Sequence, residues 1–209
     1  MITIKSKILK TLIIVDVQND FMPTGALGVP GGYEIIPVIN DLLDKFDLIV
    51  ATQDWHPKNH KSFASTHFGK KSLDKIELHG IEQILWPDHC VQGTEGADFH
   101  PDLATHRIET IFRKGTDLEF DSYSGFYDNL HKKSTGLAGY LKEKGCKELY
   151  ICGLAADICV YHTIKDAVRE GFSAKFIHDA SSPLDQINFV NIQNELYRME
   201  VAIVNSMEV

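Results

Sequence analysis

Short runs of β-branched and aromatic residues alternate with stretches of helical periodicity along most of this chain. Several runs, such as Leu12–Val15 and Leu48–Val50, are apolar without interruption, which is typical of strands buried on both faces of a parallel sheet. Strands that alternate with helices predict right-handed βαβ units. We therefore expect an α/β fold, a three-layer α/β/α structure with a mainly parallel, Rossmann-like sheet. Its six expected strands are Thr11–Val17, Asp47–Thr52, Arg107–Arg113, Glu148–Leu154, Ser173–His178 and Val201–Asn205.

One long segment does not follow this alternation of strands and helices. Residues 54–106 are rich in histidine, glycine and proline and show little periodicity, and a long irregular segment inside a compact domain is usually functional. A chain of 209 residues suits a single domain. We expect residues 1–209 to form one domain, with a loop insertion at about 54–106. The expected helices are Ile35–Phe46, Thr135–Lys144, Val160–Val168 and Asp185–Met199.

The charge balance and the cysteine count exclude several classes of function. The chain has 21 basic and 29 acidic residues and a formal net charge of −8, so it lacks the positive surface that phosphate backbones and anionic membranes attract. No apolar run approaches the roughly 20 residues of a membrane span, and residues 1–10 do not resemble a signal peptide. We expect a cytoplasmic protein without nucleic-acid or membrane partners. Four cysteines without a CxxC pair are too few for a disulfide framework.

Polar and reactive side chains follow four of the expected strands. Asp16 closes the first strand, Asp54 and His56 follow the second, and Lys114 follows the third. The fourth strand runs into a loop that ends at Cys159. Because ligands of open α/β sheets bind beyond the carboxyl ends of the strands, we expect these groups to meet at one edge of the sheet.

Cys159 is a candidate nucleophile. Asp157 is a suitable N-cap for the following helix, which places Cys159 near the second helical position. There the helix dipole would lower the pKa of the thiol, and the first-turn N–H groups could hold an oxyanion. The alternative is an inert buried cysteine, which we expect for Cys152. Cys146 is expected in a turn, and the sequence leaves Cys90 undecided.

A nucleophilic thiol needs a base and a group that stabilises charge. Asp16 could take the thiol proton and pass it to a leaving amine, while Lys114 could keep Asp16 ionised and favour the thiolate. The alternatives are a turn-forming aspartate and a solvated surface lysine. The shared location of these residues with Cys159 favours the catalytic interpretation.

Asp54, His56 and His89 form a candidate metal site. Asp54 and His56 are two residues apart, so their side chains point the same way on an extended segment. One carboxylate and two imidazoles suit Zn²⁺, Fe²⁺ or Mn²⁺ and leave positions open for water or substrate. His60 and Asp88 are alternative ligands because of their closeness in sequence. Otherwise His60, like the remaining histidines, is expected to be an ordinary surface or core residue.

Phe21, Trp86 and Tyr123 lie in expected loops rather than on periodic faces. Each alone is typical of a loop anchor. Together they could sandwich a flat ring.

Seven motifs, in order along nearly the whole chain, resemble those of the nicotinamidases, enzymes of the isochorismatase-like cysteine hydrolase superfamily. They are Asp-Val-Gln-Asn-Asp-Phe at 16–21, Gln-Asp-Trp-His-Pro at 53–57, Ser-Phe-Ala-Ser at 62–65, Leu-Trp-Pro-Asp-His-Cys-Val-Gln-Gly-Thr-Glu-Gly at 85–96, Lys-Gly-Thr-Asp at 114–117, Asp-Ser-Tyr-Ser-Gly-Phe at 121–126 and Gly-Leu-Ala-Ala-Asp-Ile-Cys-Val at 153–160. The resemblance implies the isochorismatase-like hydrolase fold.

The resemblance also implies a role for each residue of the expected thiol site. Asp16, Lys114 and Cys159 match the catalytic triad of the family. The family has a cis peptide bond at the position of Leu154–Ala155, which would direct the N–H groups of Ala155 and Cys159 at the oxyanion.

For the metal, the resemblance implies that Asp54, His56 and His89 are ligands. Some members supply a further histidine or glutamate, and the matching position here holds Ser62, which could reach the metal only weakly or through water. The ion implied is one divalent metal, Zn²⁺ first, with Fe²⁺ or Mn²⁺ as alternatives, and no organic cofactor is expected. The substrate pocket implied by the resemblance consists of Phe21, Trp86, Tyr123 and Leu154.

The implied reaction is hydrolysis of nicotinamide to nicotinic acid and ammonia through a cysteine thioester, which serves NAD salvage. Alternatives are an amidase of the same superfamily that acts on a carbamoyl or ureido substrate, and a metabolite sensor that binds without turnover. The sequence leaves homo-oligomerisation open, since nothing marks a self-complementary surface.

Overall fold

The computed structural model describes residues 9–209. Residues 1–8, which carry most of the expectation against a signal peptide, lie outside the described residues. No helix between residues 9 and 209 is long and apolar enough to cross a membrane.

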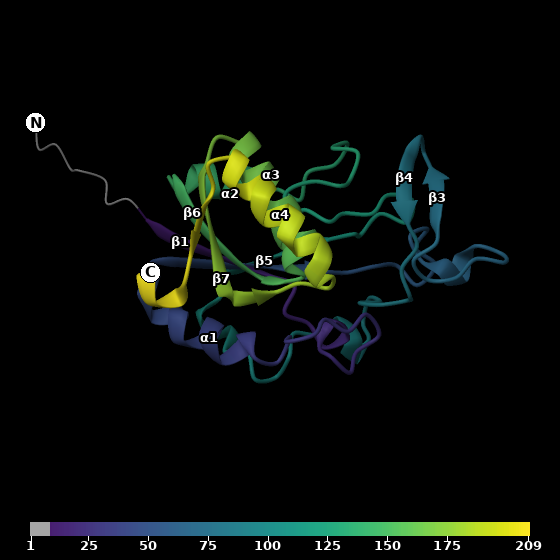
Figure 1. The fold of residues 1–209 in the computed structure, drawn as a ribbon, viewed down its shortest axis with the longest axis horizontal. Coiled ribbons are helices and arrows are strands. Elements are labelled where there is room, and N and C mark those ends of the chain that lie inside the picture. Colours follow the sequence, from purple (N-terminus) through teal and green to yellow (C-terminus); the bar gives the residue numbers. More distant parts are fainter. Residues whose placement is uncertain (1–8) are drawn as a thin grey trace, which may run out of the picture.

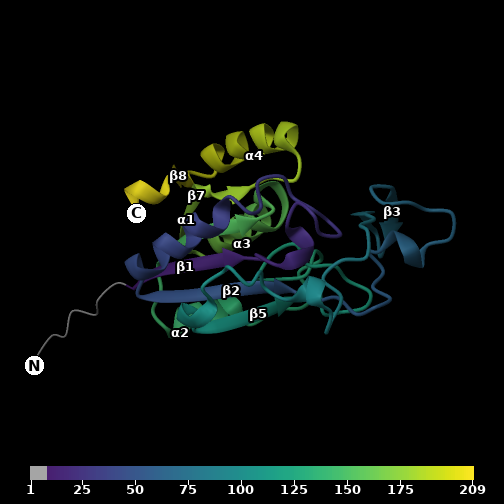
Figure 2. The ribbon, with the colours of Figure 1, turned by 90° about the horizontal axis from the view of Figure 1, so that it is seen from below.

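Six parallel strands form the central sheet, which confirms the expected α/β fold. Their order across the sheet is β5-β2-β1-β6-β7-β8, and Figure 2 shows β8 and β5 at opposite edges. From β1, the chain adds β2 and then β5 toward one edge of the sheet. It then adds β6, β7 and β8 toward the opposite edge. The strands are β1 (Lys10–Val15), β2 (Leu48–Asp54), β5 (Thr110–Lys114), β6 (Glu148–Leu154), β7 (Ser173–Ser182) and β8 (Ala202–Val204).

Helices cover both faces of this sheet (Figure 1). Alternate residues of β1 pack into two separate cores: Ile13 and Val15 contact the layer of α2, α3 and α4, whereas Leu12 and Ile14 contact the layer of α1. Burial on both faces explains why the strands read as continuous apolar runs. The α-helices within residues 9–209 are α1 (Ile35–Leu42), α2 (Leu137–Glu143), α3 (Tyr161–Arg169) and α4 (Gln186–Arg198).

The irregular segment contains a hairpin that the sequence analysis missed. Strands β3 (Lys75–Leu78) and β4 (Ile81–Ile84) pair antiparallel and extend away from the main sheet (Figures 1 and 2). They are joined by His79 and Gly80, which have φ angles of 53° and 85°. Positive φ at both positions suits a two-residue hairpin turn. On either side of the hairpin, Phe63 and Trp86 form an isolated parallel bridge.

Candidate functional site

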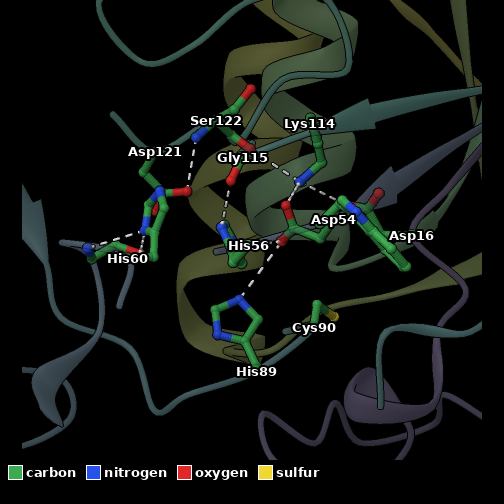
Figure 3. A network of polar contacts seen from close by, with 12 residues as sticks. Asp16, Asp54, His56, His60, His89, Cys90, Lys114, Gly115, Asp121 and Ser122 are labelled. Carbon is green, nitrogen blue, oxygen red and sulfur yellow. Dashed lines mark hydrogen bonds and ion pairs between the residues drawn. The ribbon is translucent and has the colours of Figure 1, made fainter. Parts of the chain in front are cut away.

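The expected site residues meet where the carboxyl ends of β5, β2, β1 and β6 lie side by side. Asp16 directly follows β1, Asp54 is the last residue of β2, and Lys114 is the last residue of β5. Cys159 lies in the turn after β6. The direction of chain growth reverses between β1 and β6, which is the position where open α/β sheets place their ligands. Figure 3 shows Asp16, Asp54 and Lys114 directed at one another.

Lys114 is the centre of this arrangement, and its side chain is fully buried. Its Nζ atom lies 2.9 Å from Asp16 Oδ2, 2.8 Å from Asp54 Oδ1 and 3.5 Å from Cys159 Sγ. It also donates to the backbone carbonyl of Ser122 at 3.0 Å. Burial alone would lower the pKa of Lys114, but the two carboxylates raise it well above its usual value. Lys114 is therefore a fixed cation between two carboxylates and a thiol.

Burial governs the other two members of this group. It raises the pKa of Asp16, although Lys114 and a 2.6 Å hydrogen bond from Thr52 Oγ1 oppose the rise. It also raises the pKa of the Cys159 thiol, again against Lys114. The expectation that the helix dipole lowers the pKa of the Cys159 thiol is therefore wrong, because burial raises it. That expectation considered the local helix end and left out the desolvation of a buried sulfur.

The turn that carries Cys159 also differs from its expected form. Residues Ala156–Val160 make one π-helical turn that continues into α3, and the N-cap is Ala155 rather than Asp157. The Asp157 carboxylate instead accepts hydrogen bonds from the backbone N–H groups of Leu184 and Asp185, at 2.8 and 3.0 Å. Asp157 thus anchors the chain that leads into α4.

A cavity that is partly open to solvent lies beside Cys159. Phe21, Trp86 and Tyr123 all line it, as expected, together with Ala155 of the expected oxyanion pair. Leu154 does not line it but is fully buried in the core on the α1 side. The Leu154–Ala155 peptide bond is cis. The remaining lining residues are Leu27, Val29, Asp54, His89, Asp121, Ile158 and Leu184.

Asp54, His56 and His89 form a compact group of cation ligands at the side of this cavity (Figure 3). Asp54 Oδ2 lies 3.3 Å from His56 Nε2 and 3.6 Å from His89 Nε2. The Nδ1 atom of each histidine faces a backbone carbonyl. His56 Nδ1 lies 3.0 Å from the Gly115 carbonyl oxygen, and His89 Nδ1 lies 2.8 Å from the Pro87 carbonyl oxygen. A carbonyl only accepts, so each Nδ1 carries the proton and each Nε2 presents a lone pair.

These three residues fit a divalent metal ion. When the two imidazoles are neutral, their Nε2 lone pairs and a carboxylate oxygen face one another, and the buried His56 Nε2 atom makes no hydrogen bond within residues 9–209. Imidazoles oriented by backbone carbonyls are the usual arrangement in metal sites. Burial opposes ionisation of Asp54, but the protonated form of His56 and the Lys114 cation hold its pKa well below the usual value. Asp54 therefore connects the candidate metal site to the Lys114 group.

The hydroxyl of Ser62, the expected additional metal contact, has a different partner. It lies 2.7 Å from His60 Nδ1, and the Ser62 backbone N–H donates to the same nitrogen at 3.1 Å. His60 Nδ1 is therefore an acceptor, so Nε2 carries the proton of the neutral ring and is not free to bind a metal. Asp88 is also elsewhere, since it accepts a hydrogen bond from Ser65 in an exposed position.

His60 and Asp121 are two site residues whose placement the sequence analysis did not foresee. His60 is fully buried and lies against His56, with ring centroids 4.5 Å apart. Asp121 is buried to 4% exposure and accepts a 2.8 Å hydrogen bond from the N–H of Ser122. Asp121 is the first residue of the 121–126 motif, in which Tyr123 alone was expected to have a role.

Comparisons with known proteins agree with this geometry. The family model described as "Isochorismatase domain" matches residues 10–204. A curated nicotinamidase of Acinetobacter baylyi is 52% identical over 174 residues, which cover 83% of this chain and 81% of the relative.

Solved structures give the same result. A nicotinamidase/pyrazinamidase of Acinetobacter baumanii has a TM-score of 0.94 at 43% identity, covering 98% of this chain and 99% of that one. A pyrazinamidase of Pyrococcus horikoshii in complex with zinc has a TM-score of 0.78 at 38% identity, covering 94% of this chain and 98% of that one. The chain belongs to the isochorismatase domain family.

Proposed function

We propose that this protein hydrolyses nicotinamide to nicotinic acid and ammonia through a thioester on Cys159, as a step of NAD salvage. The observation that carries the proposal is the position of Lys114 Nζ, within 3.5 Å of Cys159 Sγ and within 3 Å of both Asp16 and Asp54. One cation thereby joins a nucleophile, a base and a candidate metal ligand. Relatives that carry the name nicotinamidase support the choice of substrate.

In this proposal, Asp16 receives the thiol proton as Cys159 attacks the carboxamide carbon, and it then gives the proton to the departing ammonia. Lys114 compensates the negative charge that passes between the sulfur and the carboxylate. The N–H groups of Ala155 and Cys159 are assigned to the oxyanion of the tetrahedral intermediate. Ammonia is a small neutral product, and the acyl group stays on the sulfur until water releases nicotinic acid.

The cavity wall suits the flat ring of this substrate. Trp86 and Tyr123 lie edge to face, with ring centroids 6.2 Å apart, and Phe21 lies 5.5 Å from the ring of His89. Aromatic side chains provide apolar contact area for a pyridine ring. We assign Phe21, Trp86 and Tyr123 to ring binding.

Asp54, His56 and His89 would hold one divalent metal ion at the side of the cavity. When bound, the ion would supply a Lewis acid that fixes the pyridine nitrogen. A zinc complex among the related structures supports Zn²⁺ as the metal. One oxygen of Asp54 contacts Lys114 and the other faces the imidazoles. Asp54 would therefore fix the position of the metal site relative to Lys114. No organic cofactor enters the proposed reaction.

The proposal treats residues 1–209 as one catalytic domain of a cytoplasmic enzyme. The segment at about 54–106 would be its metal-binding insertion, since it contributes His56 and His89.

Ammonia release from nicotinamide tests the proposal. We expect the metal-loaded protein to release one ammonia per nicotinic acid formed, and Cys159→Ala to lose nearly all of this activity. Cys152→Ala is the matched control, because Cys152 is a buried cysteine in the core of β6 and should remain active. An inactive wild type with bound metal, or an active Cys159→Ala, would contradict the proposal. Turnover of carbamoyl or ureido compounds instead would favour the other amidases.

A further inference from the structure

One buried donor beside the site has no acceptor. His60 is fully buried, and the Ser62 N–H that points at its Nδ1 atom leaves the ring proton on Nε2. This Nε2 atom makes no hydrogen bond within residues 9–209. The Phe120 carbonyl lies nearby but outside hydrogen-bonding geometry. A buried N–H without a partner is costly, so an acceptor from solvent or substrate is expected there.

Asp121 offers the complementary group. One nitrogen or oxygen atom from each of His56, His60 and Asp121 lies within 4.8 Å of the other two, and Figure 3 shows His60 beside Asp121. A water molecule that makes two hydrogen bonds joins atoms about 4.6 Å apart. A separation of up to this size between a ring nitrogen of His60 and an oxygen of Asp121 leaves room for a single bridging water, and buried waters usually occupy such places.

Asp121 connects this niche to the cavity beside Cys159. Asp121 and Cys159 line the same cavity, and His60 lies against His56. Neither His60 nor Asp121 has a role in forming the thioester. Asp121 is itself fixed, because it accepts from the Ser122 N–H at 2.8 Å and from Gln83 Nε2 at 3.3 Å.

We propose that His60 and Asp121 are positioning residues that hold the water that hydrolyses the thioester. The inference rests on the proposed function. The oxygen of this water bonds to the thioester carbon, and the carbon–sulfur bond breaks with its electron pair returning to Cys159 Sγ. One water proton neutralises the sulfur and the other remains on the carboxylic acid, so the step consumes one water and regenerates the thiol. His60 donates a hydrogen bond to the water oxygen, and Asp121 accepts a hydrogen bond from one of the water O–H groups, so the water is held in one orientation.

Competition between water and hydroxylamine tests this assignment. Hydroxylamine converts the same thioester to the hydroxamic acid, and as an added nucleophile it does not depend on the niche. The ratio of hydroxamic acid to nicotinic acid therefore reports on how well water is positioned, and it is independent of thioester formation. We expect Asp121→Asn and His60→Leu to raise this ratio about tenfold, the effect of losing one buried hydrogen bond. His60→Gln keeps a donor and should stay within about threefold of the wild type.

Two variants outside the niche serve as controls. Asp117→Asn removes a carboxylate that pairs with Lys133 at the surface, and His79→Leu removes an exposed imidazole beside Glu119. Both should keep the wild-type ratio.

Three results would overturn the inference. The first is an unchanged ratio in Asp121→Asn and His60→Leu. The second is a change that tracks loss of bound metal, measured on the same samples, because it would show that the two residues act on the metal site. The third is a wild type that forms neither product, and this result alone would also overturn the proposed function.

Discussion

Replacement of Lys114 by methionine should both destabilise the protein and abolish its activity. Methionine keeps much of the length of the side chain but removes the charge and the N–H donors. Lys114 lies 2.8–2.9 Å from two buried carboxylates, and removal of one partner from a buried ion pair costs about 3–5 kcal/mol. Because native proteins are stable by only about 5–15 kcal/mol, Lys114→Met should lose a large part of its free energy of unfolding.

Lys133→Met is the matched control. Lys133 pairs with Asp117, but its side chain is 65% exposed, so loss of this pair should cost at most about 1 kcal/mol. Urea denaturation of the metal-free proteins at neutral pH measures both values. In Lys114→Met, the unpaired carboxylates should have a higher pKa folded than unfolded, so its stability deficit should shrink as the pH falls. A deficit below about 1 kcal/mol, or retention of turnover, would refute the role given to Lys114.

Three further predictions concern the surroundings of the site. Gly115→Ala should weaken metal binding at least about tenfold, because Gly115 has a φ of 63° and an added Cβ would lie 2.6 Å from His56 Nδ1; unchanged affinity in a chelator competition would contradict this. Burial and nearby lysines lower the pKa of His162 to about 4, so the unfolded chain binds the extra proton first and stability falls as the pH drops from about 6.5 to 4. His162→Gln should reduce that loss by about 1–3 kcal/mol. If the urea midpoints of the variant and the wild type fall equally with pH, this prediction is wrong. Asp157→Ala should raise KM more than it lowers kcat, because the Leu184 segment of the cavity wall loses its anchor; an unaltered KM would argue against that role.

The sheet could be predicted because its strands are buried on both faces. The expected strand Glu148–Leu154 has the bounds of β6, and the other five differ from their predictions mainly at the ends. The topology then places the carboxyl ends of four neighbouring strands together, so the meeting of Asp16, Lys114 and Cys159 follows from the strand order. The β3–β4 hairpin was missed because each strand has only four residues and Gln83 is the one residue of either strand that is buried, so no apolar run marks the strands.

The parts of the site that escaped prediction depend on contacts between distant segments. Asp157 has the residue type and the position of an N-cap, and only the approach of residues 184–185 shows that its carboxylate is used elsewhere. The helix dipole at Cys159 is a local property, whereas the burial that raises its pKa comes from the packed core. His60 became significant only because Ser62 fixes its ring proton and Asp121 is brought close by the fold.

The central claim is that nicotinamide forms a thioester with Cys159, and mass spectrometry of acid-quenched protein tests it most directly. The metal-loaded enzyme would be mixed with excess nicotinamide, quenched at low pH, digested and searched for a nicotinoyl group. We expect the group on the peptide that contains Cys159, removable by hydroxylamine and absent from Cys159→Ala. A nicotinoyl group on another residue, or turnover of nicotinamide with no adduct on Cys159 in either the wild type or Asp121→Asn, would contradict the account.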